Sequence, residues 1–90
     1  MSNYAARVVE LVNVERAKAG LAPLKVDAKA TQAAMVRAGE IRRSFSHTRP
    51  DGRTCFTALA EAGVSYRAAG ENIAAGQKTP EQVVAAWMNS

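Results

Sequence analysis

The sequence has little cysteine, histidine or aromatic content. Its 90 residues include one cysteine, one histidine, one tryptophan, two tyrosines and two phenylalanines. A single cysteine cannot form an internal disulfide, so a disulfide-stapled scaffold is excluded and only an intermolecular bridge stays open. We expect Cys55 to be a small buried apolar residue rather than a nucleophile, because the sequence marks no base dedicated to it. The hydrophobic residues make up 48% of the chain and are mostly alanine and valine, which predicts a single domain with closely packed helices.

Long hydrophobic runs and one-sided charge are also missing. No apolar run is long enough to span a bilayer, and Met1 to Tyr4 lead into a helical pattern without the apolar segment of a signal peptide. The net charge is +4, and acidic and basic residues alternate along the chain. Nucleic-acid binding usually shows a clustered basic footprint, so we do not expect a nucleic-acid partner. Weak attraction to anionic surfaces stays open.

Four helices are predicted from hydrophobic spacing and capping residues, over residues 3–18, 28–43, 54–62 and from residue 80 onward. Ser2 or Asn3, Asp27 and Thr79 are suitable N-caps, and Pro80 fits the first turn of the last helix. The residues expected to face inward are Tyr4, Val8, Leu11 and Val12 in the first helix, Ala34, Ala38, Ile41 and Phe45 from the second, Phe56 and Leu59 in the third, and Val83, Val84, Trp87 and Met88 in the fourth.

The connections between these helices carry clear turn signals. Leu21 to Leu24 read as an extended connector that the two leucines should pin to the core, since Pro23 disfavours helix before it. Residues 49–52, Arg-Pro-Asp-Gly, predict a type I turn immediately after His47. Residues 64–69 are extended or irregular, with a weak strand signal. Gly39 lies within a predicted helix, which indicates either a close approach by another segment or an exposed site that tolerates it.

His47 and Glu71 are the candidate functional residues. His47 lies between a helix and a rigid turn, so its direction is fixed, and its ordinary pKa lies near neutrality. Glu71 lies between Gly70 and Asn72 in a mostly apolar stretch, so it should not be fully solvated. We expect the two side chains to face each other across a cleft, with Arg49 and Tyr66 as further candidates for its lining.

Both residues also have an alternative interpretation, in which their role is structural only. His47 can be a turn histidine bonded to nearby backbone, and Glu71 a structural carboxylate that accepts backbone N–H groups. Together they could hold a metal ion or act as an acid–base pair. Zinc needs three or four ligands, however, and the sequence supplies no second histidine or other cysteine in a suitable place.

Four motifs in order resemble the bacterial branch of the CAP superfamily, the cysteine-rich secretory, antigen 5 and pathogenesis-related proteins, whose bacterial members are also called SCP-like extracellular domains. The motifs are Phe45-Ser46-His47 with the following Arg49 to Gly52 turn, Ala69 to Ala74, Val83 to Ser90, and the opening helix with the Leu21 to Leu24 connector. The resemblance implies an α+β fold, a truncated α-β-α sandwich. In this chain that fold would be predominantly helical, with four helices and little strand, as one partial domain over residues 1–90.

The resemblance also implies a site. His47 corresponds to the first cleft histidine and Glu71 to the first cleft glutamate. Asn72 and Tyr66 are further candidates for the lining of the same cleft. Ser90 occupies the position of the second glutamate, where bacterial members often have serine. The second histidine and the later strands lie further along the family pattern than this chain extends. His47 and Glu71 are then the expected ligands of a divalent metal such as zinc, and no residue is assigned a catalytic role.

Three functions follow as hypotheses. The first is a secreted or surface binding module without enzymatic activity, with a lipid, sterol, peptide or metal ligand. The second is a metal- or water-assisted hydrolase with Glu71 as base and His47 as ligand or acid. The third is a structural fragment that forms a homo-oligomer, or is completed by another chain, through uncovered apolar helix faces.

Overall fold

A computed structural model describes all 90 residues and contains four α-helices. They are α1 (Asn3–Lys18), α2 (Ala28–Ile41), α3 (Thr57–Glu61) and α4 (Pro80–Met88). The only β pairing is an isolated antiparallel bridge between Thr48 and Thr54. The prediction of a mostly helical chain is therefore confirmed. Residues 64–69 are irregular, as predicted, and their weak strand signal does not correspond to a strand. With no strand to form a central layer, the structure does not confirm the α-β-α sandwich.

The helices begin where the capping residues predict. Ser2 accepts a hydrogen bond from the Ala5 N–H (3.1 Å), Asp27 from Ala30 (2.8 Å) and Thr79 from Gln82 (3.1 Å). Each of these side chains satisfies one of the N–H groups that a helix leaves unpaired at its start. α3 is shorter than predicted, since Thr54 pairs with Thr48 instead of joining the helix.

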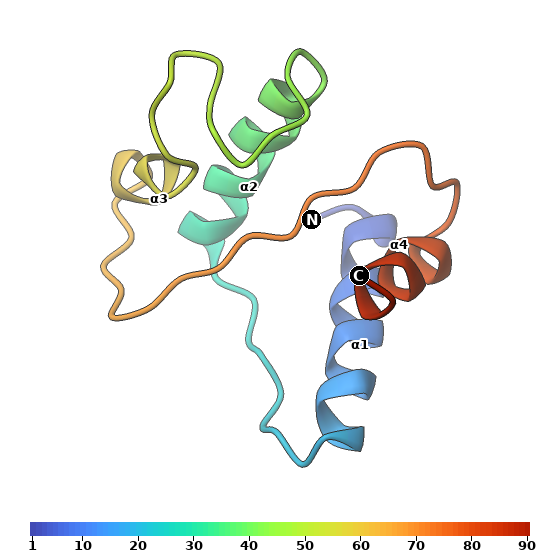
Figure 1. Ribbon diagram of the computed structural model, residues 1–90. Helices are drawn as coiled ribbons and strands as arrows, with labels where there is room; N and C mark the ends of the chain where they lie inside the picture. Colours follow the sequence, from blue (N-terminus) through green and yellow to red (C-terminus); the bar gives the residue numbers. More distant parts are fainter. The chain divides into compact units, whose positions relative to one another are not determined.

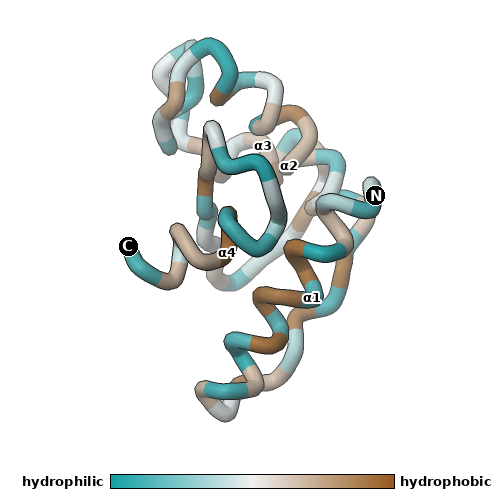
Figure 2. The backbone as a smooth tube through the Cα atoms, turned by 90° about the vertical axis from the view of Figure 1, so that its right-hand side faces the viewer, coloured by the Kyte–Doolittle hydropathy of each residue, from teal (hydrophilic) through white to brown (hydrophobic).

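Two compact units make up the chain, and each is described by itself. Unit 1 comprises residues 1–26 and 76–90 and contains both termini, with α1 packed against α4 (Figure 1). Val83 and Val84 of α4 are buried as predicted, whereas Met88 is 58% exposed. Hydrophobic and hydrophilic residues both occur along α1 (Figure 2), and none of its residues is fully buried.

The connector after α1 is held by polar contacts rather than by its leucines. Leu21 and Leu24 are each 52% exposed, so the prediction that they pin the connector was wrong. Instead the Asn13 side chain accepts from the Leu24 N–H (2.7 Å) and donates to the Leu24 carbonyl (3.1 Å). Arg16 donates to the Ala22 carbonyl at 2.7 Å. These bonds satisfy backbone groups that a non-helical segment cannot pair internally.

Unit 2 comprises residues 27–75, with α2 packed against α3 (Figure 1). The buried residues of α2 are Ala33 and Arg37; of the residues predicted to face inward, Ile41 is half-buried, and Ala34, Ala38 and Phe45 are exposed. Phe45 is 55% exposed. Arg37 is buried together with its ion pairs to Glu40 and Glu71, so its face of α2 lies toward the interior. No helix of the structure has the length and apolar character needed to cross a membrane.

Candidate functional site

A tight turn brings His47 next to Cys55. The Gly52 N–H donates to the Arg49 carbonyl at 2.8 Å, which confirms the turn predicted over residues 49–52. Gly52 has φ +89°, a conformation that residues with a Cβ rarely adopt. Beyond the turn the chain runs back antiparallel, and the Cys55 N–H donates to the His47 carbonyl at 3.1 Å. The turn therefore fixes the distance between the single histidine and the single cysteine of the chain.

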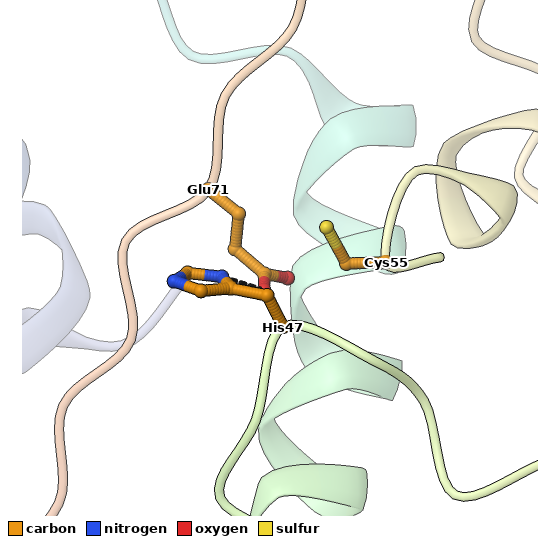
Figure 3. A group of neighbouring side chains, drawn as sticks. All are labelled: His47, Cys55 and Glu71. Carbon is orange, nitrogen blue, oxygen red and sulfur yellow. Dashed lines mark hydrogen bonds and ion pairs between the residues drawn. The ribbon is translucent and has the colours of Figure 1, made fainter. Parts of the chain in front are cut away.

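Glu71 reaches this pair from an extended segment that follows α3. Its Oε1 lies 2.9 Å from His47 Nδ1, and its side chain is only 16% exposed (Figure 3). In the same view the sulfur of Cys55 is turned toward Glu71. The ligand atoms of His47, Cys55 and Glu71 all lie within 4.8 Å of one another. His47 and Glu71 are thus in direct contact rather than on opposite sides of a cleft.

Arg37 of α2 holds the Glu71 carboxylate by two hydrogen bonds. Its Nε donates to Oε2 at 2.9 Å and its Nη2 to Oε1 at 3.1 Å. The same guanidinium donates to the Ser46 carbonyl (2.6 Å) and to Glu40 Oε1 (2.9 Å). Because a guanidinium is planar and presents its donors in a fixed fork, these four bonds set the position of Glu71 relative to α2 and to the residue before His47.

A second buried guanidinium, Arg49, locks the turn. It donates to both oxygens of Glu40, with the shortest contact at 2.7 Å, and to Thr57 (2.9 Å) and Glu61 (2.8 Å). Hydrogen bonds from Arg49 and then from Arg37 lower the pKa of Glu40 to about 2. Arg49 was expected to line a cleft with His47 and Glu71. Instead its side chain forms ion pairs with Glu40 and Glu61, and it does not line the cavity that Glu71 borders.

The surroundings of Glu71 lower its pKa, whereas those of Cys55 raise the pKa of its thiol. Burial acts to raise the pKa of Glu71, but the hydrogen bonds from Arg37 and His47 outweigh it, so its pKa lies below the ordinary value. Burial raises the pKa of the Cys55 thiol, and the charge of Glu71 and a hydrogen bond to it raise it further. Near neutral pH the site therefore contains a carboxylate beside a protonated thiol.

Glu71 also borders a mostly apolar hollow of about 250 Å³ between α2 and α3. Its walls include Ala33, Ala34, Phe56 and Leu59, and its polar edge includes Arg37, Glu71 and Asn72. Phe56 and Leu59 were predicted to face inward, and they do so as walls of this hollow. A polar edge on an apolar hollow is the usual composition of a small-molecule site.

Not every predicted site residue joins this group. Asn72 lines the hollow, whereas Tyr66 is 46% exposed and is not part of the lining. Ser90 belongs to unit 1, where its hydroxyl donates to the Trp87 carbonyl at 2.7 Å. Its proposed place in the site rests on the resemblance alone.

Sequence reasoning missed Arg37 and the position of Cys55. A signal for each was present. Arg37 stands three residues before Glu40, the spacing of a helical ion pair, in a stretch of α2 rich in alanine. Cys55 follows the predicted turn at the distance that places it opposite His47 in a hairpin-like reversal. Neither signal alone predicts a site, because both Arg37 and Cys55 acquire their role from Glu71, which lies close to each of them.

Comparison with known proteins identifies similar sequences. The model of "CAP: Cysteine-rich secretory protein family" matches residues 9–90. The chain is also 46% identical over 92 residues to "Uncharacterized protein YkwD" of Bacillus subtilis (strain 168), an alignment that covers 100% of this chain and 36% of that protein. The chain thus spans about a third of that relative's length. No solved structure matches.

Proposed function

Because this chain belongs to the cysteine-rich secretory protein (CAP) family, we propose that it is a secreted or surface binding module without enzymatic activity, whose site contains His47 and Glu71. The observation that carries the proposal is the joining of a fixed polar pair to an apolar hollow. Glu71 belongs to both, because it contacts His47 at 2.9 Å and lines the hollow. Such a site suits a ligand with an apolar body and one polar group.

The charge at the edge narrows the ligand class. Glu71 is ionised; its Oε1 accepts from Arg37 and contacts His47, and its Oε2 accepts from Arg37, which leaves acceptor capacity mainly at Oε2 for a donor from the ligand. A sterol hydroxyl or a peptide N–H can use this capacity, whereas a fatty-acid carboxylate would meet a like charge. The hollow of about 250 Å³ is below the usual size for a whole drug-sized ligand, so it would take one apolar group of a larger molecule. We therefore place sterols and peptides ahead of fatty acids.

The hydrolase hypothesis has less support. A general base works best when its pKa lies near the working pH. The two hydrogen bonds from Arg37, with that from His47, keep the pKa of Glu71 below its ordinary value, which makes its carboxylate a weak base. The same bonds are favourable in a binding site, because they fix the acceptor before the ligand arrives.

Association with a second copy, or with a chain that completes the domain, stays a further proposal. Large hydrophobic side chains of unit 2 are open to solvent, including Met35 (70% exposed), Phe45 (55%) and Val36 (50%). An association surface usually contains such residues. Light scattering that shows a monomer throughout a concentration series would contradict self-association.

The binding proposal is tested with a fluorescent sterol and two matched variants of α2. Both positions are exposed, but Ala34 lines the hollow and Ala38, one turn further, does not. We expect Ala34→Trp to fill the hollow and weaken sterol binding at least about tenfold, about 1.4 kcal/mol. Ala38→Trp adds the same side chain to the same helix and should bind as the wild type does. Equal binding by wild type and Ala34→Trp would remove the hollow from the site.

A further inference from the structure

The three side chains that converge beside the turn offer three different ligand atoms. His47 supplies a ring nitrogen, Cys55 a sulfur and Glu71 a carboxylate oxygen, all within 4.8 Å of one another. His47 and Glu71 were expected as ligands from the sequence, whereas Cys55 was not. We propose that His47, Cys55 and Glu71 together bind a zinc ion, with Cys55 as the thiolate ligand. This deepens the proposed function, on which it rests: the resemblance implied a divalent cation at His47 and Glu71, and the structure adds Cys55 as its third ligand.

The separation of the ligand atoms is close to what zinc requires. Bonds of roughly 2.0–2.3 Å in a tetrahedral arrangement place neighbouring ligand atoms about 3.3–3.7 Å apart. The observed limit of 4.8 Å therefore has to shrink by about 1 Å. The side chain of His47 is 60% exposed, so its ring can rotate without disturbing packed neighbours.

The donor set selects the class of cation. Zinc combines readily with imidazole nitrogen, thiolate sulfur and carboxylate oxygen, whereas Mg²⁺ and Ca²⁺ prefer oxygen alone. Three protein ligands leave a fourth position for water or for a polar group of another ligand. The exposed ring of His47 gives the cation a path from solvent. When the Zn–S bond forms, the thiol proton passes to solvent and the sulfur binds as thiolate.

The surrounding hydrogen bonds constrain all three ligand residues before a cation binds. Arg37 fixes Glu71 by bonds of 2.9 and 3.1 Å, and the backbone bond of 3.1 Å from Cys55 to His47 holds the other two together. Such outer contacts commonly decide metal affinity. The positive charge of Arg37 opposes a nearby cation, but Glu40 accepts a hydrogen bond from the same guanidinium at 2.9 Å and offsets that charge. The Cys55 thiolate adds a further negative charge once the cation is bound.

Cobalt(II) titration of the full chain tests the proposal, because it reports thiolate ligation by charge-transfer absorption. Cys55 is the only cysteine, so any such band from one chain must come from it. We expect one Co²⁺ per chain with a thiolate band, displaced by Zn²⁺. Cys55→Ala should abolish the band and weaken Zn²⁺ binding at least about tenfold. His47→Ala should weaken binding while leaving the thiol in place.

The controls separate loss of a ligand from loss of the fold. Glu10→Gln removes an acid that is 65% exposed in unit 1 and should bind Co²⁺ as the wild type does. Cys55→Ser preserves the size of the side chain, and its circular dichroism spectrum checks that the helices persist. The proposal is overturned if no thiolate band appears. It is also overturned by one cation shared between two chains, or by equal Zn²⁺ affinity in wild type and Cys55→Ala. If sterol binding persists in any of these cases, the zinc proposal is wrong and the proposed binding function still stands.

Discussion

Arg37 and Glu71, 34 positions apart in the sequence, form a two-point ion pair with distances of 2.9 and 3.1 Å. The Arg37 side chain is only 6% exposed and the Glu71 side chain 16%. This pair joins α2 to the extended segment after α3, and it holds the carboxylate that contacts His47. The geometry of the candidate site therefore depends on a residue that does not itself belong to the proposed ligand set.

We expect Arg37→Ala to destabilise the protein by about 3 kcal/mol, because it leaves the partly buried Glu71 without its cationic partner. Arg37→Lys should recover only part of the loss, since an ammonium group cannot reproduce the planar two-point contact. Urea unfolding measures both. Arg7→Ala is the matched control: Arg7 is 49% exposed and pairs with Glu10 on the surface, so the change should be within about 0.5 kcal/mol. Equal losses for Arg37→Ala and Arg7→Ala would contradict the structural role of Arg37.

Acid should unfold the protein by protonating Glu40. The pKa of this carboxyl is about 2 in the folded protein, below the ordinary value of 4.5, because Arg49 and Arg37 donate to it. A lowered folded pKa stabilises the native state above the unfolded pKa, and this stability is lost as pH falls from 4.5 toward 2.

The measurement is the urea midpoint at several pH values for wild type and Glu40→Gln. The variant should be less stable at neutral pH, and its midpoint should fall less steeply below pH 4.5. Some acid dependence should remain, because the pKa values of Asp51, Glu61 and Glu71 are also lowered. Glu10→Gln should follow the wild-type curve. Parallel curves for wild type and Glu40→Gln would show that Glu40 does not couple protonation to folding.

Local features of the fold could be predicted from the sequence because their causes are local. Ser2, Asp27 and Thr79 cap helices by contacts three residues away, and the turn over residues 49–52 is set by its own proline and glycine. These interactions need no knowledge of the rest of the chain. The apolar neighbours of Glu71 in the sequence likewise predicted that its side chain is not fully solvated, and it is 16% exposed.

The inward face of α2 could not be predicted in the same way. Hydrophobic spacing favoured Ala34 and Phe45, but the buried positions are Ala33 and Arg37. A buried arginine is stable only when it is paired with an acceptor. The main partner of Arg37, Glu71, comes from a distant segment, so the burial of Arg37 could not be predicted from α2 alone. The site's third candidate ligand, Cys55, was missed for the same reason: its place depends on a hairpin-like reversal whose pairing is not visible in composition.

Asn13 should hold the connector after α1. Its side chain makes two hydrogen bonds to the backbone of Leu24, at 2.7 and 3.1 Å. Asn13→Leu removes both, and we expect a loss of about 1–2 kcal/mol in the free energy of unfolding. Amide hydrogen exchange gives a local readout, because the Leu24 N–H should exchange faster in the variant. Val14→Ala alters the next residue, which is 48% exposed, and should leave that exchange rate unchanged. An unchanged Leu24 rate in Asn13→Leu would mean that other contacts fix the connector.

Two glycines should respond in opposite directions to the same substitution. Gly39 lies within α2, and a Cβ built there meets nothing within 4 Å, so the close approach considered from the sequence is absent. Gly39→Ala should therefore stabilise the protein by about 0.5–1 kcal/mol, the difference in helix propensity. Gly52 has equally open space around it but a φ of +89°.

At Gly52 the cost of a side chain therefore comes from the backbone alone. We expect Gly52→Ala to destabilise the protein by about 1–2 kcal/mol, since a residue with a Cβ is strained at this φ. Thermal unfolding of the two variants beside wild type makes the comparison, because both add one methyl group to an unobstructed position. The Gly52→Ala variant should also loosen the turn that sets Cys55 opposite His47, so its cobalt affinity should fall while that of Gly39→Ala does not. A stabilised Gly52→Ala with unchanged cobalt binding would show that this turn does not depend on a glycine.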